Sequence, residues 1–417
     1  MPSVRKIIYT TITAIFAIVL LEAVLFVAAV TLYGVEQLLA RPGISGSITN
    51  STLDAQPILT RPAPSRSVAD SILGARPNPE YPGHDSNGFR NTTVPRRSDV
   101  VALGDSQTYG VGVAADAAWP HQFELLTGYS TYSMAFGGYG PVHSLLLWDE
   151  AIALKPQIII EALYAGNDLF DSFNIVYNNG QHSELRSPDL GTQKSIVAAE
   201  SNESIADHVT QMFTQGHANT VGSKVKSGTP HPIRSFLSEY SRIYGLLRRL
   251  QFESLQLKPA ATRNSSYTQS FEDGPFRTVF TSEYRLSALD QQDPRIVEGR
   301  EISLKAIAIM NELAAEQTIR FVVVLIPTKE LVFKNLWSEP SASFATLTSN
   351  EILFWSRTKA FLKANNIDFI DVLPALRGQL ESGIQPYHST QDGHPNKFGH
   401  QAIAASLSDR LTRTTTP

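Results

Sequence analysis

A serine at the end of a predicted strand is the first residue that could do covalent chemistry. Ser106 follows the apolar run 100–103 and the pair Gly104-Asp105, in the sequence VVALGDSQTYG. The run favours a buried strand, and open α/β sheets hold their functional groups at the carboxyl ends of their strands. A hydroxyl there becomes a nucleophile if a base takes its proton. A serine at a strand-to-helix turn can equally cap the helix, so this residue alone leaves both interpretations open.

A histidine and an aspartate near the other end of the chain could supply that base and the group that orients it. His394 and Asp392 stand two residues apart in the sequence QDGHPN, residues 391–396. Acyl transfer at a serine needs both groups, together with N–H donors for the oxyanion. A loop can turn the two side chains into one cleft. The pair Asp392-Gly393 is also typical of a turn, and His394 could be an ordinary loop histidine.

Two further motifs stand between these segments. They are FGGYG at residues 136–140 and AGND at residues 165–168, and each follows a predicted strand. Together with Ser106 and residues 391–396, they resemble the four blocks of the SGNH/GDSL hydrolase family, in the order of that family. The resemblance extends over roughly residues 85–410 and is dense only around the blocks.

The resemblance implies that Ser106 is the nucleophile, His394 the base and Asp392 the acid that orients it. In many members of the family the acid stands three residues before the histidine. Gln391 occupies that position here and cannot carry a charge. Asp392 must therefore serve, as the corresponding residue does in some related carbohydrate acetyltransfer proteins.

The resemblance also implies an oxyanion hole. The backbone N–H of Gly138 and the side-chain amide of Asn167 would be donors, with the N–H of Ser106 as a third. Without that role, Gly138 is a turn glycine and Asn167 a loop residue. No cofactor is implied. The segment around Ser106 lacks the Gly-x-Ser-x-Gly elbow, which disfavours an α/β-hydrolase fold.

Two other groups of residues could bind a ligand. A zinc site could be built from residues that cluster near the C-terminus, although their spacing matches no standard zinc motif: His388, Asp392, His394 and His400. Lys329 follows a predicted strand at the same sheet edge and could contact an anionic or sugar substrate. A solvated loop lysine is the alternative.

Predicted strands and helices alternate through the domain. This alternation predicts a doubly wound parallel sheet, and the resemblance implies a three-layer α/β/α, flavodoxin-like architecture. The predicted strands are 100–103, 131–135, 157–164, 321–326 and 368–372. The predicted helices are 119–126, 142–154, 301–316, 351–365 and one that begins near Lys397.

The alternation stops in an insertion at about residues 171–300. Residues 175–232 are polar with weak periodicity, and residues 255–295 resemble a loop. Between them, residues 235–249 have the pattern of an amphipathic helix. A structureless stretch this long is unusual in a compact domain. We therefore interpret the insertion as a lid or cap that shapes the substrate cleft.

An apolar segment near the N-terminus predicts a membrane anchor. Residues 7–33 exceed the roughly 20 residues that span a bilayer, with Glu22 as their only charge. Arg5 and Lys6 precede the span, which predicts a cytoplasmic N-terminus and a domain outside the inner membrane. A cleaved signal peptide is the alternative. Glu22 could contact a multipass membrane partner or could merely be tolerated.

These features divide the chain into three parts. Residues 1–35 form the cytoplasmic tip and the anchor, 36–98 a stalk, and 99–412 the catalytic domain. Eight prolines between residues 41 and 98 predict an extended segment. Its end, at residues 85–90, is expected to pack on the domain.

Composition excludes several functions. The 417 residues are 42% hydrophobic and 18% charged, which is typical of a globular protein. A net charge of −4 argues against nucleic-acid binding. The chain has no cysteine, so thiolate metal sites and cysteine nucleophiles are excluded.

The sequence thus predicts a membrane-anchored serine esterase or acyltransferase that acts on a small ester or an acylated carbohydrate. The carbohydrate would belong to the cell envelope or to an exported polysaccharide, which rests on the family resemblance alone. A non-catalytic scaffold of a polysaccharide export complex is the alternative. The intact set of serine, histidine and aspartate argues against it.

Overall fold

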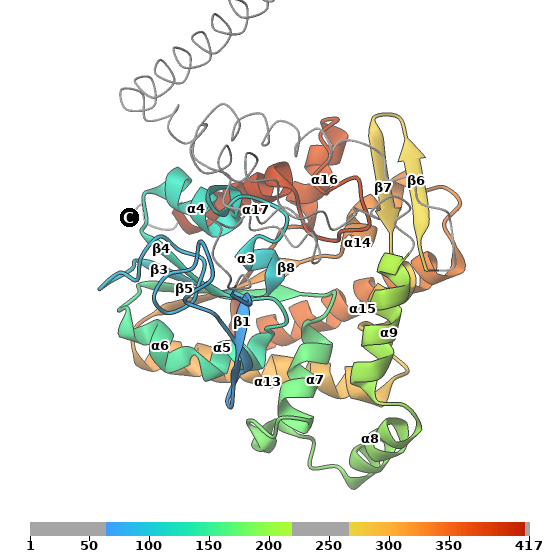
Figure 1. The fold of residues 1–417 in the computed structure, drawn as a ribbon, viewed down its shortest axis with the longest axis horizontal. Helices are drawn as coiled ribbons and strands as arrows, with labels where there is room; N and C mark the ends of the chain where they lie inside the picture. Colours follow the sequence, from blue (N-terminus) through green and yellow to red (C-terminus); the bar gives the residue numbers. More distant parts are fainter. Residues whose placement is uncertain (1–63, 219–266, 413–417) are drawn as a thin grey trace, which may run out of the picture. The chain divides into compact units, whose positions relative to one another are not determined.

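The central sheet of the computed structural model consists of five parallel strands in the order β4-β3-β5-β8-β9. The labelled strands of this sheet lie in the middle layer of Figure 1. The structure describes residues 64–218 and 267–412. In chain order the strands are β3 (Val100–Gly104), β4 (Thr131–Ala135), β5 (Ile158–Tyr164), β8 (Arg320–Ile326) and β9 (Asp368–Asp371). Counted along the chain, their spatial order is 2-1-3-4-5, the flavodoxin-like order. The predicted doubly wound parallel sheet is confirmed.

Helices cover both faces of the sheet, so the domain has three layers (Figure 1). Val101 and Leu103 of β3 belong to the core on one face, and Val100 and Ala102 to the core on the other. The first core includes α5 (Pro141–Leu146), α6 (Trp148–Ala153), α7 (Asp168–Tyr177), α13 (Pro294–Glu316) and α15 (Ala342–Ala364). The second includes α4 (Trp119–Thr127), α14 (Lys329–Phe333), α16 (Leu373–Glu381) and α17 (Lys397–Thr412). Burial on both faces explains the continuous apolar runs of the strands.

Some helix boundaries differ from the expected ones. The single helix expected at 142–154 is interrupted at Leu147 and forms α5 and α6. α13 begins at Pro294, earlier than expected, because the Asp293 side chain accepts a hydrogen bond from the Arg295 N–H and caps the helix. α15 likewise begins early, after its cap Ser341. Short 3-10 turns lie at Ala115–Ala117, Ser183–Leu185 and Lys334–Leu336.

Residues 64–98 are folded onto the domain, in contrast to the extended stalk expected there. β1 (Ser67–Asp70) and β2 (Gly74–Pro77) form an antiparallel hairpin. Phe89 is fully buried, and the Asp85 carboxylate accepts hydrogen bonds from the Tyr132 hydroxyl at 2.8 Å and the Phe89 N–H at 3.1 Å. Residues 85–90 therefore pack on the domain, as expected. Residues 41–63 of the predicted stalk lie outside the described residues.

The described part of the insertion contains regular elements, although its sequence pattern is weak. They are α8 (Leu190–Asn202), α9 (Ile205–Ala218), a hairpin of β6 (Gln269–Asp273) and β7 (Phe276–Phe280), and α12 (Ser282–Ser287). Ile196 is the only buried residue of α8, so the helix carries little apolar signal. The helix predicted at 235–249 lies outside the described residues.

The predicted membrane span at residues 7–33 also lies outside the described residues. No helix within 64–218 or 267–412 has both the length and the hydropathy that a membrane crossing requires.

Candidate active site

Ser106 begins α3 (Ser106–Tyr109), directly after the carboxyl end of β3. The preceding Asp105 caps this helix, because its carboxylate accepts a hydrogen bond from the Gln107 N–H at 2.8 Å. Gly104 allows the sharp turn: its φ is +143°, and a Cβ there would lie 2.6 Å from Thr108 Oγ1. Asp105 thus takes the capping role that Ser106 could have had, which leaves the Ser106 hydroxyl available for other partners.

The Ser106 hydroxyl lies within hydrogen-bond distance of the predicted base. Ser106 Oγ and His394 Nε2 are 2.8 Å apart, although 288 positions separate them in the sequence. On the other side of the ring, His394 Nδ1 lies 2.5 Å from Asp392 Oδ1. A carboxylate can only accept, so the Nδ1 proton points to Asp392 and Nε2 is left to accept the serine proton. This is the geometry that an activated serine requires.

Asp392 is the acid that reaches the histidine, although Gln391 stands at the usual position. Its Oδ1 accepts hydrogen bonds from both the backbone N–H and the ring Nδ1 of His394. Burial alone would raise the pKa of Asp392, but the charge and hydrogen bonds of His394 outweigh it and hold that pKa well below its usual range. Asp392 therefore stays ionised and can stabilise an imidazolium.

The predicted oxyanion donors lie at the same sheet edge. A Cβ placed on Gly137 would be 3.8 Å from Ser106 Cβ, whereas one on Gly138 would meet no atom within 4 Å. Gly137 thus approaches the nucleophile, and Gly138, at a φ of +81°, allows the turn beside it. Asn167 directly precedes α7, and its Nδ2 donates to Asp171 Oδ2 at 2.5 Å. A longer contact of 3.4 Å joins the same Nδ2 to Asp168.

Sequence reasoning missed a group of buried carboxyls beneath this edge. Burial raises the pKa of Asp105 to about 6, and it raises that of Glu161 and Asp171 to about 8. Burial, together with the nearby Asp105, also raises the pKa of Asp168 well above its usual range. The spacing of Asp168 and Asp171 in the first turn of α7 was visible in the sequence, but their proximity to Asp105 depends on the packing of two strands.

Lys329 is buried and is not a solvated loop lysine. Its side chain is only 1% exposed. The ammonium donates to the backbone carbonyls of Val279 at 2.7 Å, Thr390 at 2.9 Å and Asp392 at 3.0 Å. The solvated loop lysine is therefore contradicted, because β7 and the segment that carries Thr390 and Asp392 enclose this residue. Contact with a substrate stays a prediction.

Arg285 of α12 is a second buried cation that the sequence did not reveal. Its guanidinium lies over the rings of Tyr164 and Tyr284, and its Nη1 donates to the Gly166 carbonyl at a long 3.4 Å. A Cβ added to Gly393 would lie 2.4 Å from Nη2 of this buried side chain. A larger residue between Asp392 and His394 would therefore displace the Arg285 guanidinium.

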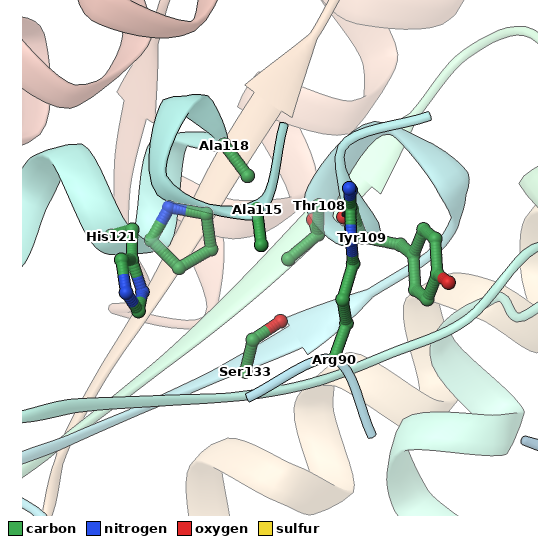
Figure 2. Close-up of a pocket in the computed structure, with 8 residues that line it drawn as sticks. Arg90, Thr108, Tyr109, Ala115, Ala118, His121 and Ser133 are labelled. Carbon is green, nitrogen blue, oxygen red and sulfur yellow. Dashed lines mark hydrogen bonds between the residues drawn. The ribbon is translucent and has the colours of Figure 1, made fainter. Parts of the chain in front are cut away.

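A third buried cation, Arg90, lines a pocket beside α3 (Figure 2). The view shows its side chain extending towards Thr108 and Tyr109. The guanidinium donates to the carbonyls of Tyr109, Gly110 and Val113, at 2.7 to 3.0 Å. Ser106, Asp392 and His394 do not line this pocket. Arg90 thus supports the turn that ends α3 and helps to hold residues 85–90 against it.

The four residues considered for a zinc site serve other contacts. His394 contacts Ser106 on one side of its ring and Asp392 on the other, whereas His400 Nδ1 accepts from the Trp119 N–H at 3.3 Å. His388 is buried beside Gly112, where a Cβ would lie 2.8 Å from its Nε2. Within the described part of the chain, no group of three or more such side chains is arranged to hold a metal ion.

Comparison with known proteins identified distant structural relatives. No family model and no curated protein matches the chain. A lipolytic protein of the G-D-S-L family from Desulfitobacterium hafniense is similar at 12% identity and a TM-score of 0.36, over 75% of this chain and 99% of that one. Phospholipase A1 from Streptomyces albidoflavus is similar at 12% identity and a TM-score of 0.37, over 75% and 99%. A catalytic mutant of an acetylxylan esterase from Geobacillus stearothermophilus is similar at 10% and 0.33, over 75% and 94%. Because these values are low, the function is inferred below from the geometry of the site.

Proposed function

We propose that this protein is an SGNH/GDSL-type serine esterase or acyltransferase that works through an acyl intermediate on Ser106. One observation carries the proposal: a continuous chain of hydrogen bonds from Asp392 through His394 to Ser106, with distances of 2.5 and 2.8 Å. The three side chains come from two segments at the carboxyl edge of the parallel sheet, where such folds bind their ligands.

The reaction follows from this arrangement. His394 Nε2 takes the proton of Ser106 as the oxygen attacks the ester carbonyl, and Asp392 stabilises the imidazolium that forms. The imidazolium then gives its proton to the departing alcohol, which leaves an acyl-Ser106 ester. Water or a sugar hydroxyl next loses a proton to His394 and attacks this ester. His394 returns this proton to the Ser106 oxygen as the acyl–Ser106 bond breaks, which releases the acid or the acylated sugar and restores the hydroxyl.

The oxyanion would be stabilised by N–H groups beside Ser106. We propose the backbone N–H groups of Ser106 and of the Gly137-Gly138 turn, with the Asn167 amide as the side-chain donor. That amide carries two hydrogens, so Asp171 can fix its plane through one of them at 2.5 Å, while the other would exchange its long 3.4 Å contact with Asp168 for the oxyanion. The buried Asp171 thereby acts as a support for Asn167.

A covalent probe tests the proposed function independently of any natural substrate. A fluorophosphonate should label the wild-type protein, and peptide mass spectrometry should place the label on Ser106, because only an activated serine reacts readily. The Ser106→Ala variant is the matched control and should remain unlabelled. No labelling of a folded wild-type protein would favour the alternative of a non-catalytic scaffold in a polysaccharide export complex.

For the substrate we propose an O-acylated carbohydrate of the cell envelope or of an exported polysaccharide. The family resemblance of the four blocks supports this class. Acetate release from an acetylated glycan would indicate a hydrolase, and transfer of the acetyl group to an added glycan acceptor would indicate an acyltransferase. A preference for long-chain esters over both would contradict the carbohydrate assignment.

We further propose that residues 7–33 anchor the protein in the inner membrane with its catalytic domain in the periplasm. The length of this apolar segment and the preceding Arg5 and Lys6 support that topology. A C-terminal alkaline phosphatase fusion should be active, and the protein should stay in the membrane pellet after a carbonate wash. A soluble product shortened to about Ala29 would instead mean a cleaved signal peptide, and an inactive fusion would mean a cytoplasmic domain. If residues 7–33 span the membrane as proposed, Glu22 would be a contact for a multipass membrane partner.

A further inference from the structure

The loop that carries Asp392 and His394 lacks regular secondary structure of its own. We call residues 388–394, which lie between α16 and α17, the catalytic loop. An isolated bridge between Tyr387 and Pro395 closes its base. The loop must nevertheless hold Asp392 Oδ1 at 2.5 Å from the imidazole. Loops have more conformational freedom than helices and strands, so groups outside the loop must supply this precision.

Lys329 is placed to fix the position of the catalytic loop. Its ammonium has three hydrogens, and the structure gives it three carbonyl acceptors. Two of them, Thr390 and Asp392, belong to the catalytic loop and flank Gln391. The third, Val279, belongs to β7. The lysine therefore connects the backbone of the catalytic loop to the hairpin and to α14, whose first residue it is.

A neighbouring contact supports the same connection. The Thr278 hydroxyl of β7 lies 3.0 Å from the His388 carbonyl and 3.4 Å from the Thr390 carbonyl. The hairpin thus contacts the start of the catalytic loop directly and its middle through Lys329. The β6–β7 part of the insertion thus supports the catalytic loop, a role that the interpretation of the insertion as a lid or cap did not include.

The cost of burying Lys329 argues for a specific role. Within the described residues no carboxylate lies within ion-pair distance of its ammonium, so its direct partners are three neutral carbonyls, and the charges of Glu330 and Asp392 act from a greater distance. Burial lowers the pKa of Lys329 to about 8. An apolar side chain of similar volume would avoid this desolvation penalty. The compensating benefit therefore lies at the carbonyls that the ammonium contacts.

We propose that Lys329 is a positioning residue that holds the catalytic loop so that Asp392 can orient His394. The inference rests on the proposed function. Lys329 touches neither the substrate nor the reacting atoms. It acts on the backbone at Asp392, the residue whose side chain orients the base, and its positive charge also favours the ionised form of that carboxyl.

The test compares Lys329→Met with Lys305→Met in the full chain. Lys305 is a matched control, because its ammonium also donates to a backbone carbonyl, that of Leu185 at 2.7 Å, but within α13 and away from the site. We expect Lys329→Met to lower kcat for an acetyl ester about 10- to 100-fold, as a displacement of about 1 Å would. KM should change less than about twofold, because the residue makes no ground-state contact. Lys305→Met should keep both constants.

A double-mutant cycle separates positioning from general stability. In an Asp392→Asn background, Lys329→Met should cost less than about a third of its effect on kcat in the wild type, because the carboxylate that it positions is already lost. An equal loss in both backgrounds would overturn the proposal, as would an unchanged kcat in folded Lys329→Met. A wild type without activity would instead refute the proposed function, so the two failures are distinguishable.

Two further measurements cover the other outcomes. Proton NMR should show the low-field signal of the His394 Nδ1 proton in wild type and Lys305→Met but not in Lys329→Met, whether or not the ester is a substrate.

If Lys329→Met does not fold, Thr278→Val removes one neutral hydrogen bond to the same loop. We expect it to lower kcat by about three- to tenfold at constant KM. An unchanged kcat in Thr278→Val would then overturn the proposal.

Discussion

Ser106→Ala is expected to lower kcat for a chromogenic acetyl ester by about 10⁴-fold or more while the protein stays folded. The substitution removes the oxygen that we propose forms the acyl-enzyme and that lies 2.8 Å from His394 Nε2. Steady-state kinetics with the purified variant measures the loss. Because Asp105 rather than Ser106 caps α3, the melting temperature should change little.

The control for this prediction is a check that the Ser106→Ala variant is folded. Circular dichroism and thermal unfolding should match those of the wild type. A folded Ser106→Ala variant that retains more than a tenth of an active wild type's rate would remove Ser106 from the mechanism.

Asp392→Asn is expected to have the second largest effect, a loss in kcat of about 10⁴-fold. An amide can donate to Nδ1, so the imidazole would turn or take the wrong tautomer, and the imidazolium would lose its stabilising charge. Gln391→Glu in the same background tests whether the usual acid position can restore the rate. Retained activity in Asp392→Asn would indicate that another carboxylate orients His394.

The same carboxyl predicts a pH dependence of stability. In the folded protein its pKa lies below the reference value of 3.8. Such a group stabilises the fold above the unfolded-state pKa and loses this contribution as the pH falls towards the folded-state pKa. The difference in melting temperature between wild type and Asp392→Asn should therefore be largest above about pH 5 and shrink towards pH 3. Because the Asp392 side chain is still 29% exposed, salt should reduce the difference.

The sequence by itself determined the elements that carry strong local signals. The apolar runs of β3, β5 and β8 predict buried parallel strands because such strands are covered on both faces. The order of the motifs predicts which side chains meet at one edge, because the carboxyl ends of parallel strands coincide. Weak local signals explain the differences. α8 buries only Ile196, and the early start of α13 depends on the cap formed by Asp293.

Only the tertiary structure decided the roles of the buried cations. Arg90, Arg285 and Lys329 resemble surface residues in the sequence, yet each is buried and donates to backbone carbonyls of a segment near the site. Carbonyl acceptors are present at every residue and leave no trace in the amino-acid pattern. The partner of a buried cation is therefore set by how distant segments pack, as Lys329 illustrates by joining β7 to the catalytic loop.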